Sequence, residues 1–152
     1  MIYKYGTSGF RYKSKTLINI SNKIGKYLAY LASREDKYIG IIITASHNPA
    51  CDNGVKIVNS SGSLLLKDEE KECTDFINNK LEDPLILQNN IPKIIIGNDT
   101  RRSGPLIKRL IIGGIKSIID NAIVEDIGYL STPQMHYELV SINQKIKMLY
   151  EN

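Results

Sequence analysis

The segment GIIITASHNPACDNGVK, residues 40–56, constrains the fold of this chain more than any other part of the sequence. Its β-branched apolar start predicts a buried strand. The string TASHNP, residues 44–49, then combines small and turn-forming residues that are too closely spaced for regular structure. The tight-turn signal DNG, residues 52–54, predicts that a second strand begins at Val55. The sequence therefore predicts a loop that carries the hydroxyl group of Ser46 between two strands.

Two further side chains of this segment are candidates for chemistry. His47 directly follows Ser46, and Lys56 lies where the chain returns into the second strand. The residues alone leave a plainer alternative open, in which the serine and asparagine side chains only satisfy their own backbone. In that alternative Lys56 is a solvated lysine at the end of a strand.

The N-terminal string YGTSGFR, residues 5–11, is a second candidate for anion binding. Two glycines bracket two hydroxyl groups, so backbone amides can approach an anion closely. Arg11 adds a planar fork of donors that suits phosphate or carboxylate. Taken alone, the pattern is also typical of an ordinary loop, with Arg11 in a surface ion pair.

The rest of the chain alternates apolar strands with amphipathic helices. Apolar spacings of three and four predict helices over residues 17–34, 67–80, 104–121 and 133–142. Ser103 and Thr132 are the predicted N-caps of the last two helices. Further strands are predicted over residues 93–96 and 122–125. Strands that alternate with helices predict an α/β domain, with a mostly parallel, mixed sheet flanked by helices.

This fold class predicts where a site should lie. Ligands of open α/β sheets gather at the carboxyl ends of the strands. Ser46 and Asp99 both follow predicted strands, so we expect them at the same edge of the sheet.

Length, hydropathy and cysteine spacing bound the class of protein. The 152 residues fit one domain that can bury a core of its own. No apolar run approaches the length of a membrane span, and the start MIYKYGTSGFRYK lacks the apolar region of a secretory signal. Cys51 and Cys73 show neither metal-ligand nor CxxC spacing, which predicts two reduced thiols. We therefore expect a cytoplasmic protein without a membrane partner.

The charge pattern bears on the class of ligand. The 20 basic residues are scattered among 16 acidic ones, for a net charge of +4, and form no dense basic run or basic-aromatic stripe. That distribution argues against a nucleic-acid partner. Small phosphorylated ligands fit the same net charge.

Four motifs together resemble the α-D-phosphohexomutase family and cover nearly the whole chain. TASHNP followed by DNGVK is similar to the family's phosphoserine loop, and YGTSGFR is similar to its N-terminal YGTxGxR segment. GNDTR, residues 97–101, resembles its GRDTR turn, and residues 126–136 resemble its D-x-G-x-x-x-T-P-Q-x-H element. The resemblance implies the fold of the first of the family's four domains.

The order of the motifs narrows the resemblance. In most of the family the GRDTR and T-P elements precede the serine loop, whereas here the serine loop comes first, shortly after YGTSGFR. That order is similar to the eukaryotic branch of the family that acts on N-acetylglucosamine phosphate. The resemblance therefore implies an isomerase that interconverts N-acetylglucosamine 6-phosphate and 1-phosphate by phosphoryl transfer. A glucose- or mannose-type mutase is the alternative within the family.

The resemblance also implies roles for the matching positions. Ser46 matches the serine that is phosphorylated and passes its phosphoryl group to the sugar, which gives a 1,6-bisphosphate. Mg²⁺ is implied as a ligand of the phosphoryl group on Ser46. Lys56 and Arg11 match basic residues beside the transferred group, where Lys56 stabilises charge or shuttles a proton. His47 adjoins the phosphoserine, and either bonds to it or holds the loop.

Two departures from the family's pattern limit how much of the family's active site is present in this sequence. Asn98 stands where the family has arginine in GRDTR, so the charge there is missing or comes from Arg102. The Asp-rich DGDxDR metal loop, like domains 2–4 as a whole, has no counterpart in residues 1–152. We therefore expect domain 1 of a phosphosugar mutase, inactive by itself, with the remaining mutase domains as a partner if they are encoded separately. The alternative is a non-catalytic remnant that binds phosphosugar or another protein.

Overall fold

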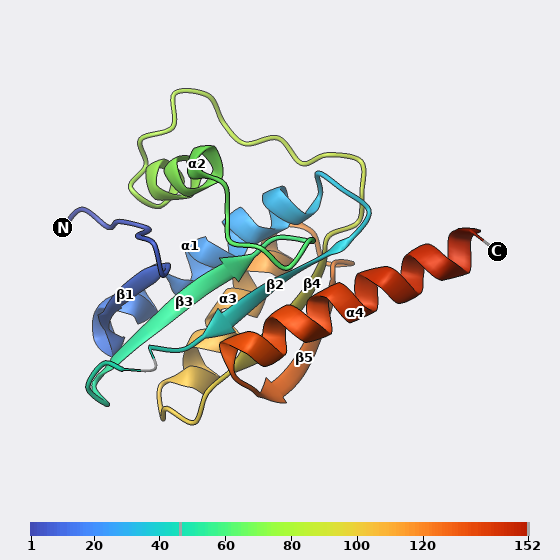
Figure 1. Ribbon diagram of the computed structural model, residues 1–152. Coiled ribbons are helices and arrows are strands. Elements are labelled where there is room, and N and C mark those ends of the chain that lie inside the picture. The colour runs from blue at the N-terminus through green and yellow to red at the C-terminus, as the bar shows by residue number, and fades with distance from the viewer. Residues whose placement is uncertain (46, 152) are drawn as a thin grey trace.

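The computed structural model describes residues 1–45 and 47–151, which form one sheet flanked by helices (Figure 1). In chain order, the elements of the described residues are β1 (Phe10–Lys13), α1 (Ser14–Ala32), β2 (Tyr38–Ile43), β3 (Asp52–Val58), α2 (Lys67–Ile77), β4 (Lys93–Asn98), α3 (Gly104–Ile118), β5 (Ile123–Tyr129) and α4 (Thr132–Glu151). No helix in this part of the chain combines the length and the apolar character needed to cross a membrane.

The sheet has the strand order β1-β3-β2-β4-β5 and is mixed. β3 is antiparallel to both of its neighbours, β1 and β2, whereas β2, β4 and β5 are parallel to each other. All strands except β3 therefore run in the same direction, which confirms the predicted α/β fold with a mostly parallel, mixed sheet. β3 is reversed because a short loop, and not a helical crossover, connects it to β2.

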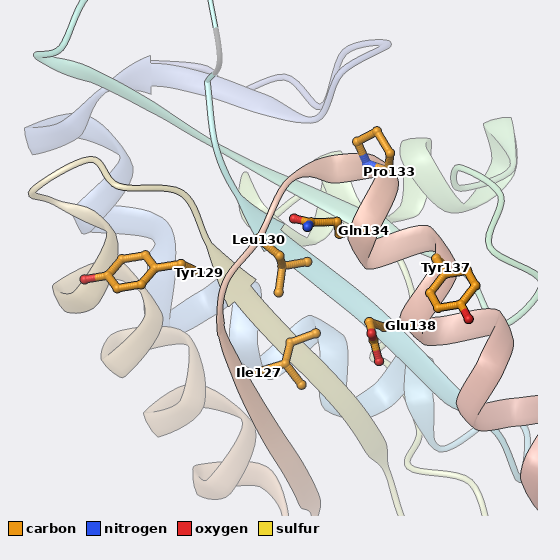
Figure 2. Close-up of a pocket in the computed structure, with 7 residues that line it drawn as sticks. All are labelled: Ile127, Tyr129, Leu130, Pro133, Gln134, Tyr137 and Glu138. Atoms are coloured by element: carbon orange, nitrogen blue, oxygen red, sulfur yellow. The ribbon is translucent and has the colours of Figure 1, made fainter.

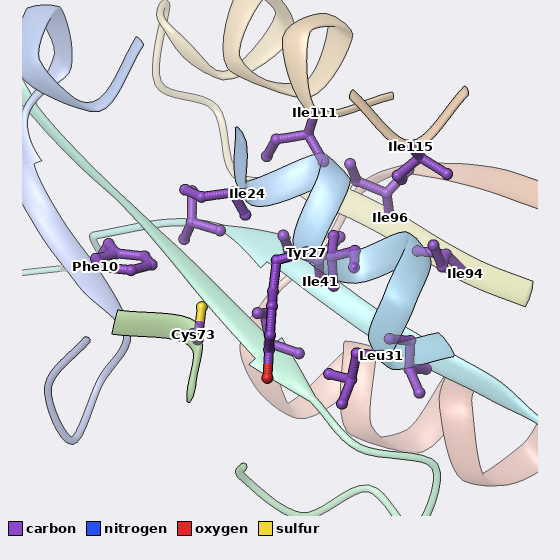
Figure 3. Packing of buried hydrophobic residues seen from close by; sticks show 14 of the residues in the cluster. Phe10, Ile24, Tyr27, Leu31, Ile41, Cys73, Ile94, Ile96, Ile111 and Ile115 are labelled. Atoms are coloured by element: carbon purple, nitrogen blue, oxygen red, sulfur yellow. The ribbon is translucent and has the colours of Figure 1, made fainter. Parts of the chain in front are cut away.

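Helices cover both faces of the sheet, with α1 and α3 on one face and α4 on the other (Figure 1). The side chains of β2 alternate between these faces: Ile41 and Ile43 belong to the cluster beneath α1 and α3, and Ile42 belongs to the cluster beneath α4. Figure 3 shows the larger cluster, in which Ile24 of α1 and Ile111 of α3 pack over the sheet. Because both faces are covered there, β2 and the middle of β4 are nearly continuous apolar runs.

α1 and α3 touch backbone to backbone at two glycines. A Cβ atom on Gly25 would lie 2.0 Å from the carbonyl oxygen of Ile111, and one on Gly114 would lie 1.9 Å from that of Asn22. Both distances are far shorter than a van der Waals contact, so glycine is required at each position. This contact explains Gly25, which in a helix interior otherwise only lowers helix propensity.

Some element boundaries differ from the sequence prediction. Residues 5–11 are expected to form a loop, but the last of them already belong to the edge strand β1, which pairs with β3. β4 and β5 continue past their predicted ends, to Asn98 and Tyr129. α4 continues as far as Glu151. The sheet and its last helix are thus longer than the apolar pattern indicates.

Ser103 occupies the N-cap position of α3 as predicted, but its side chain does not cap the helix. Its Oγ accepts hydrogen bonds from Ser14 Oγ at 3.0 Å and from Asn53 Nδ2 at 2.8 Å. Ser103 therefore joins the starts of α1, β3 and α3, where a cap had been expected.

The prediction that Thr132 caps α4 is wrong, because Thr132 is the first residue of the helix. Ser131 provides the cap. The backbone amide of Gln134 donates to Ser131 Oγ at 3.4 Å, and the amide of Ser131 donates to Gln134 Oε1 at 2.7 Å. This reciprocal pair satisfies two of the free amides at the helix start.

Candidate active site at the loop between β2 and β3

The loop that follows β2, residues 44–51 and called the serine loop below, lies at the carboxyl ends of β2 and β4. The backbone amide of Asp99 donates to the carbonyl oxygen of Ile43 at 3.0 Å, which places the residue after β4 beside the start of the loop. Thr44 Oγ1 donates to Asp99 Oδ2 at 2.7 Å. The predicted position of Asp99 at the strand ends is therefore confirmed.

Ser46, on which the sequence-based hypothesis centres, lies outside the described residues. Of its neighbours, Ala45 is buried and His47 is exposed on the loop. The phosphoserine and metal-binding roles of Ser46, and the role of His47 beside it, stay predictions.

Arg11 and Lys56 are brought together on one face of the sheet. Arg11 pairs with Gly54 across β1 and β3, and Lys56 lies two residues further along β3. Side chains two residues apart in a strand point to the same face. Val58, again two residues on, packs in the cluster beneath α4, which identifies that face. Arg11 also reaches the serine loop, where its Nη1 donates to Asn48 Oδ1 at 3.4 Å.

The environment of Lys56 disfavours its positive charge. Partial burial lowers the pKa of Lys56, and the guanidinium of Arg11 lowers it further. Within residues 1–45 and 47–151, neither cation forms an ion pair with an acidic side chain. A half-buried ammonium group beside a second cation, with no counterion, is a physical reason to expect an anionic ligand here.

The N-terminal string folds into a tight turn against β3. Gly6 and Gly9 exchange amide-to-carbonyl hydrogen bonds of 3.1 and 3.2 Å. Gly9 has a φ of +84°, and a Cβ atom there would lie 2.1 Å from the carbonyl oxygen of Val55. The turn therefore packs next to Lys56. Its two glycine amides are used within the turn itself and are not free to bind an anion.

Arg101 holds the serine loop from the segment after β4, and the sequence alone assigns it no role. Its Nη1 donates to the carbonyl oxygens of Pro49 at 2.6 Å and Asp52 at 3.0 Å. Its Nη2 donates to those of Ala45 at 2.5 Å and Asn48 at 2.9 Å. Carbonyl oxygens from the start and the middle of the loop and from the first residue of β3 thus converge on one guanidinium group.

The guanidinium is in turn held by Asp99. Arg101 Nε lies 3.4 Å from Asp99 Oδ2, and the backbone amide of Arg101 donates to Asp99 Oδ1 at 3.0 Å. The side chain of Arg101 is only 13% exposed. Its two Nη atoms donate four hydrogen bonds to carbonyl oxygens, and its Nε lies within ion-pair distance of Asp99. A buried charge requires such pairing. The sequence signal is the string DTR after a predicted strand, while the acceptors lie 49 to 56 residues away in the chain.

Asn98, the departure from the family's GRDTR pattern, is buried beside a cation. Lys108 Nζ donates to Asn98 Oδ1 at 2.8 Å and lies 3.0 Å from Asp126 Oδ2. Arg102, suggested by the sequence as the substitute charge, is exposed and has no hydrogen bond or ion pair in the described part of the chain. The charge next to Asn98 is therefore that of Lys108, which reaches it from α3.

The described residues do not form a metal site by themselves. Among them, no three histidine, cysteine or acidic side chains are grouped so as to hold an ion. Both carboxylate oxygens of Asp99 already accept hydrogen bonds, from Thr44 and from Arg101. Because Mg²⁺ needs several oxygen ligands, these residues do not fit a complete magnesium site.

Two surface hollows differ in their relation to the serine loop. One, of about 470 Å³, is lined by Asn48 and Ala50 of the loop and by residues 99–102. The other, of about 670 Å³, lies between the end of β5 and the start of α4 (Figure 2). The second hollow is larger and does not border the serine loop, and neither hollow is lined by Arg11, His47 or Lys56. The first hollow therefore borders the serine loop, but not the pair of cations formed by Arg11 and Lys56.

Comparison with known proteins gives a consistent result. The family "Phosphoglucomutase/phosphomannomutase, alpha/beta/alpha domain I" matches residues 26–84 and 85–147. Phosphoacetylglucosamine mutase 1 of Schizosaccharomyces pombe is 40% identical over 154 residues, which cover 93% of this chain and 29% of the relative. Human phosphoacetylglucosamine mutase is 35% identical over 149 residues, which cover 90% of this chain and 27% of the relative.

Solved structures agree with the sequence relatives. N-acetylphosphoglucosamine mutase of Aspergillus fumigatus, in complex with GlcNAc-6P and magnesium, superposes with a TM-score of 0.83 at 29% identity, over 95% of this chain and 28% of that one. The substrate complex of an N-acetylglucosamine-phosphate mutase gives a TM-score of 0.80 at 32% identity, over 95% of this chain and 30% of that one. This chain thus spans less than a third of the length of the relatives that it matches.

Proposed function

The chain belongs to the phosphoglucomutase/phosphomannomutase family, in which it corresponds to domain I, and we propose that it supplies the phosphoserine-bearing domain of a phosphoacetylglucosamine mutase. The proposed reaction is the interconversion of N-acetylglucosamine 6-phosphate and 1-phosphate. Relatives that match nearly all of this chain are phosphoacetylglucosamine mutases. Because the match covers 29% of the first of them, the activity is proposed for this domain together with the rest of such an enzyme.

The pair of cations beside the serine loop carries the proposal. Arg11 and Lys56 share one face of the sheet and have no acidic partner among the described residues, and the guanidinium of Arg11 lowers the pKa of Lys56. A phosphoryl group on Ser46 would provide the negative charge that this pair lacks. Charges held in place before the reaction stabilise the transition state of phosphoryl transfer without reorganising.

In the proposed reaction, Ser46 Oγ gives its phosphoryl group to a hydroxyl of N-acetylglucosamine phosphate. The P–O bond to Ser46 breaks as a P–O bond to the sugar forms, while the sugar hydroxyl loses a proton and Ser46 Oγ gains one. The 1,6-bisphosphate then reorients within the site, so that its other phosphoryl group faces Ser46. It returns that phosphoryl group to Ser46. The sum is an isomerisation that consumes no phosphate.

The other predicted residues receive roles consistent with their positions. Lys56 and Arg11 are proposed to stabilise charge on the transferring group. A lowered pKa also suits Lys56 for moving a proton, since an amine that loses its proton more readily is better matched to neutral pH. His47 is proposed to bond to the phosphoryl group or to hold the loop. Mg²⁺ is proposed to contact the phosphoryl group on Ser46, with its other ligands from outside residues 1–152.

The test compares this chain alone with a fusion protein, in which the chain replaces the matching 29% of the fission-yeast mutase. Interconversion of the two N-acetylglucosamine phosphates is assayed with Mg²⁺ and a bisphosphate activator. We expect turnover from the fusion protein and none from the chain alone. Turnover by the chain alone would contradict the proposal that the remaining parts of the site lie elsewhere.

Ser46→Ala in the fusion protein tests the central residue. We expect this variant to remain folded, to lose turnover, and to lose the mass of one phosphoryl group in intact-mass analysis. Circular dichroism provides the control for folding. A fully active fusion protein without a phosphoryl group on Ser46 in any preparation would contradict the mechanism.

A further inference from the structure

We propose that Arg101 is a positioning residue, which fixes the serine loop in the shape that phosphoryl transfer requires. The inference rests on the function proposed above for that loop. Arg101 contacts neither the sugar nor the phosphoryl group in this proposal. It acts through the backbone of the loop.

The acceptors of Arg101 span the loop from its start to the first residue of β3. Ala45 lies near the start, Asn48 and Pro49 lie in the middle, and Asp52 begins β3. Carbonyl oxygens that converge on one point repel each other unless a cation lies between them. The shape of the loop is therefore conditional on the charge and the fork geometry of Arg101.

Arg101 also ties the loop to the sheet. It contacts Asp99 through both its Nε and its backbone amide, and Asp99 in turn accepts a hydrogen bond from Thr44 at the start of the loop. The amide of Asp99 is bonded to Ile43 at the end of β2. The ends of two central strands therefore set the position of the loop, as a site for phosphoryl transfer demands.

The same contacts decide which side of the loop faces outwards. A trans peptide points its C=O and N–H groups in opposite directions, and the described residues contain no cis peptide. Because the carbonyl of Pro49 points to Arg101, the amide of Ala50 points away from it. Arg101 draws the carbonyl oxygens of the loop towards itself. In this proposal their negative ends therefore point away from the side of the loop that binds the phosphoryl group.

The first experiment measures the loop in the 152-residue chain by amide hydrogen exchange. In the native chain the amides of Asn48 and Asp52 donate to carbonyl oxygens within the loop, at 2.7 and 3.0 Å. In Arg101→Gln we expect both amides to exchange about tenfold faster or more, because the contacts that hold the loop are lost. Arg101→Lys should behave alike, since an ammonium group lacks the planar fork.

Arg102→Gln is the matched control for these exchange measurements. It removes the neighbouring guanidinium, which is exposed and has no hydrogen bond or ion pair among the described residues. We expect it to leave the exchange of Asn48 and Asp52 unchanged.

The second experiment measures turnover of the same variants in the fusion protein. Arg101→Gln and Arg101→Lys should lower kcat by about 10²-fold, because misplacing reacting groups by about 1 Å has an effect of that size. KM for N-acetylglucosamine 6-phosphate should change by less than about threefold, because Arg101 does not contact the substrate. A merely structural role would instead reduce the amount of folded protein and leave kcat per folded molecule unchanged.

Two results would overturn the inference: native exchange rates at Asn48 and Asp52 in Arg101→Gln, or native kcat in a folded Arg101→Lys fusion protein. If Arg101→Gln does not fold, Arg101→Lys serves for both measurements because it keeps the charge. A fusion protein with native Arg101 and no turnover would overturn the proposed function instead, so the two failures are distinguishable.

Discussion

The serine loop and the contact between α1 and α3 are held together in opposite ways. At the loop, the long side chain of Arg101 binds four carbonyl oxygens. At the helix contact, the absence of side chains at Gly25 and Gly114 lets two backbones touch. The loop depends on polar contacts that one substitution removes, whereas the helix contact depends on space that one methyl group would fill.

The difference indicates which property each region controls. An arginine that organises a surface loop lies outside the apolar core, so its loss should change the loop more than the stability of the domain. A glycine between packed helices has no functional group, so its substitution should change stability first. Chemistry and stability are therefore expected to respond separately to substitutions in the two regions.

The largest effect is expected on the loop side, for Lys56→Met in the fusion protein. Loss of one preorganised charge near the transferring group should lower kcat by about 10²-fold or more, with a much smaller change in KM. Lys67→Met, at the exposed start of α2, is the control and should have native kinetics. Steady-state rates decide the matter, and a native kcat in Lys56→Met would reduce this residue to a surface lysine.

The next largest effect is expected on stability, at the contact between α1 and α3. Gly25→Ala places a methyl group 2.0 Å from the carbonyl oxygen of Ile111, so α1 and α3 must separate. We expect a loss of about 3 kcal/mol in the free energy of unfolding, measured by urea denaturation of the 152-residue chain. The same change in the fusion protein should leave kcat per folded molecule unchanged.

Gly113→Ala is the matched control for the helix contact. A Cβ atom on Gly113 would have Asn22 Nδ2 as its nearest neighbour, at 3.7 Å, which is an ordinary contact. This variant should gain about 0.5–1 kcal/mol from better helix propensity. Equal stability of the Gly25 and Gly113 variants would contradict the account of the contact.

The smallest expected effect is a change in the stability of the domain that comes from Lys56, a residue of the proposed chemistry. Its pKa is lower in the folded chain than the ordinary value of 10.5, so the unfolded chain binds more protons between the two pKa values, and stability rises with pH in that interval. This penalty is fully present below the folded-state pKa and is lost as the pH rises through the ordinary value. Lys56→Met should therefore stabilise the chain at pH 7, by less than about 1 kcal/mol because solvent screens a partly exposed charge.

Added inorganic phosphate tests whether Lys56 takes part in binding an anion. Inorganic phosphate should raise the Tm of the native chain more than that of Lys56→Met, compared with chloride at equal ionic strength. Thermal unfolding at pH 7 measures both quantities. An equal response of the two proteins to phosphate would mean that Lys56 takes no part in anion binding.

Much of the fold follows from local patterns in the sequence. β2 and β4 are predictable because helices cover both faces of the sheet, so each strand reads as an uninterrupted run of apolar residues. β1 escapes prediction because it has four residues at the sheet edge, and its burial alternates with exposed Arg11 and Lys13. The cap of α4 was misjudged because Ser131 and Thr132 stand side by side at the helix start, and either hydroxyl could serve as the cap.

The candidate site is predictable to a smaller extent. Arg11 and Lys56 are candidates from the local sequence and gain roles from the resemblance, but only the register of β1 on β3 shows that they share a face. Arg101 escapes prediction because its acceptors are backbone carbonyl oxygens, which every residue has. Gly25 escapes it because its constraint is the position of Ile111 in another helix. Contacts of this kind leave no pattern of side chains to recognise.

The separation in sequence between Arg101 and its acceptors sets an order of events during folding. The acceptors precede Arg101 by 49 to 56 residues, so in a growing chain they leave the ribosome first. The contacts of Arg101 with the loop require the closure of a long segment, and the pairing of β4 with β2 helps to offset the entropic cost of that closure. The residues of the loop are synthesised early, but their contacts with Arg101 form late. These contacts require a sheet that extends through β4.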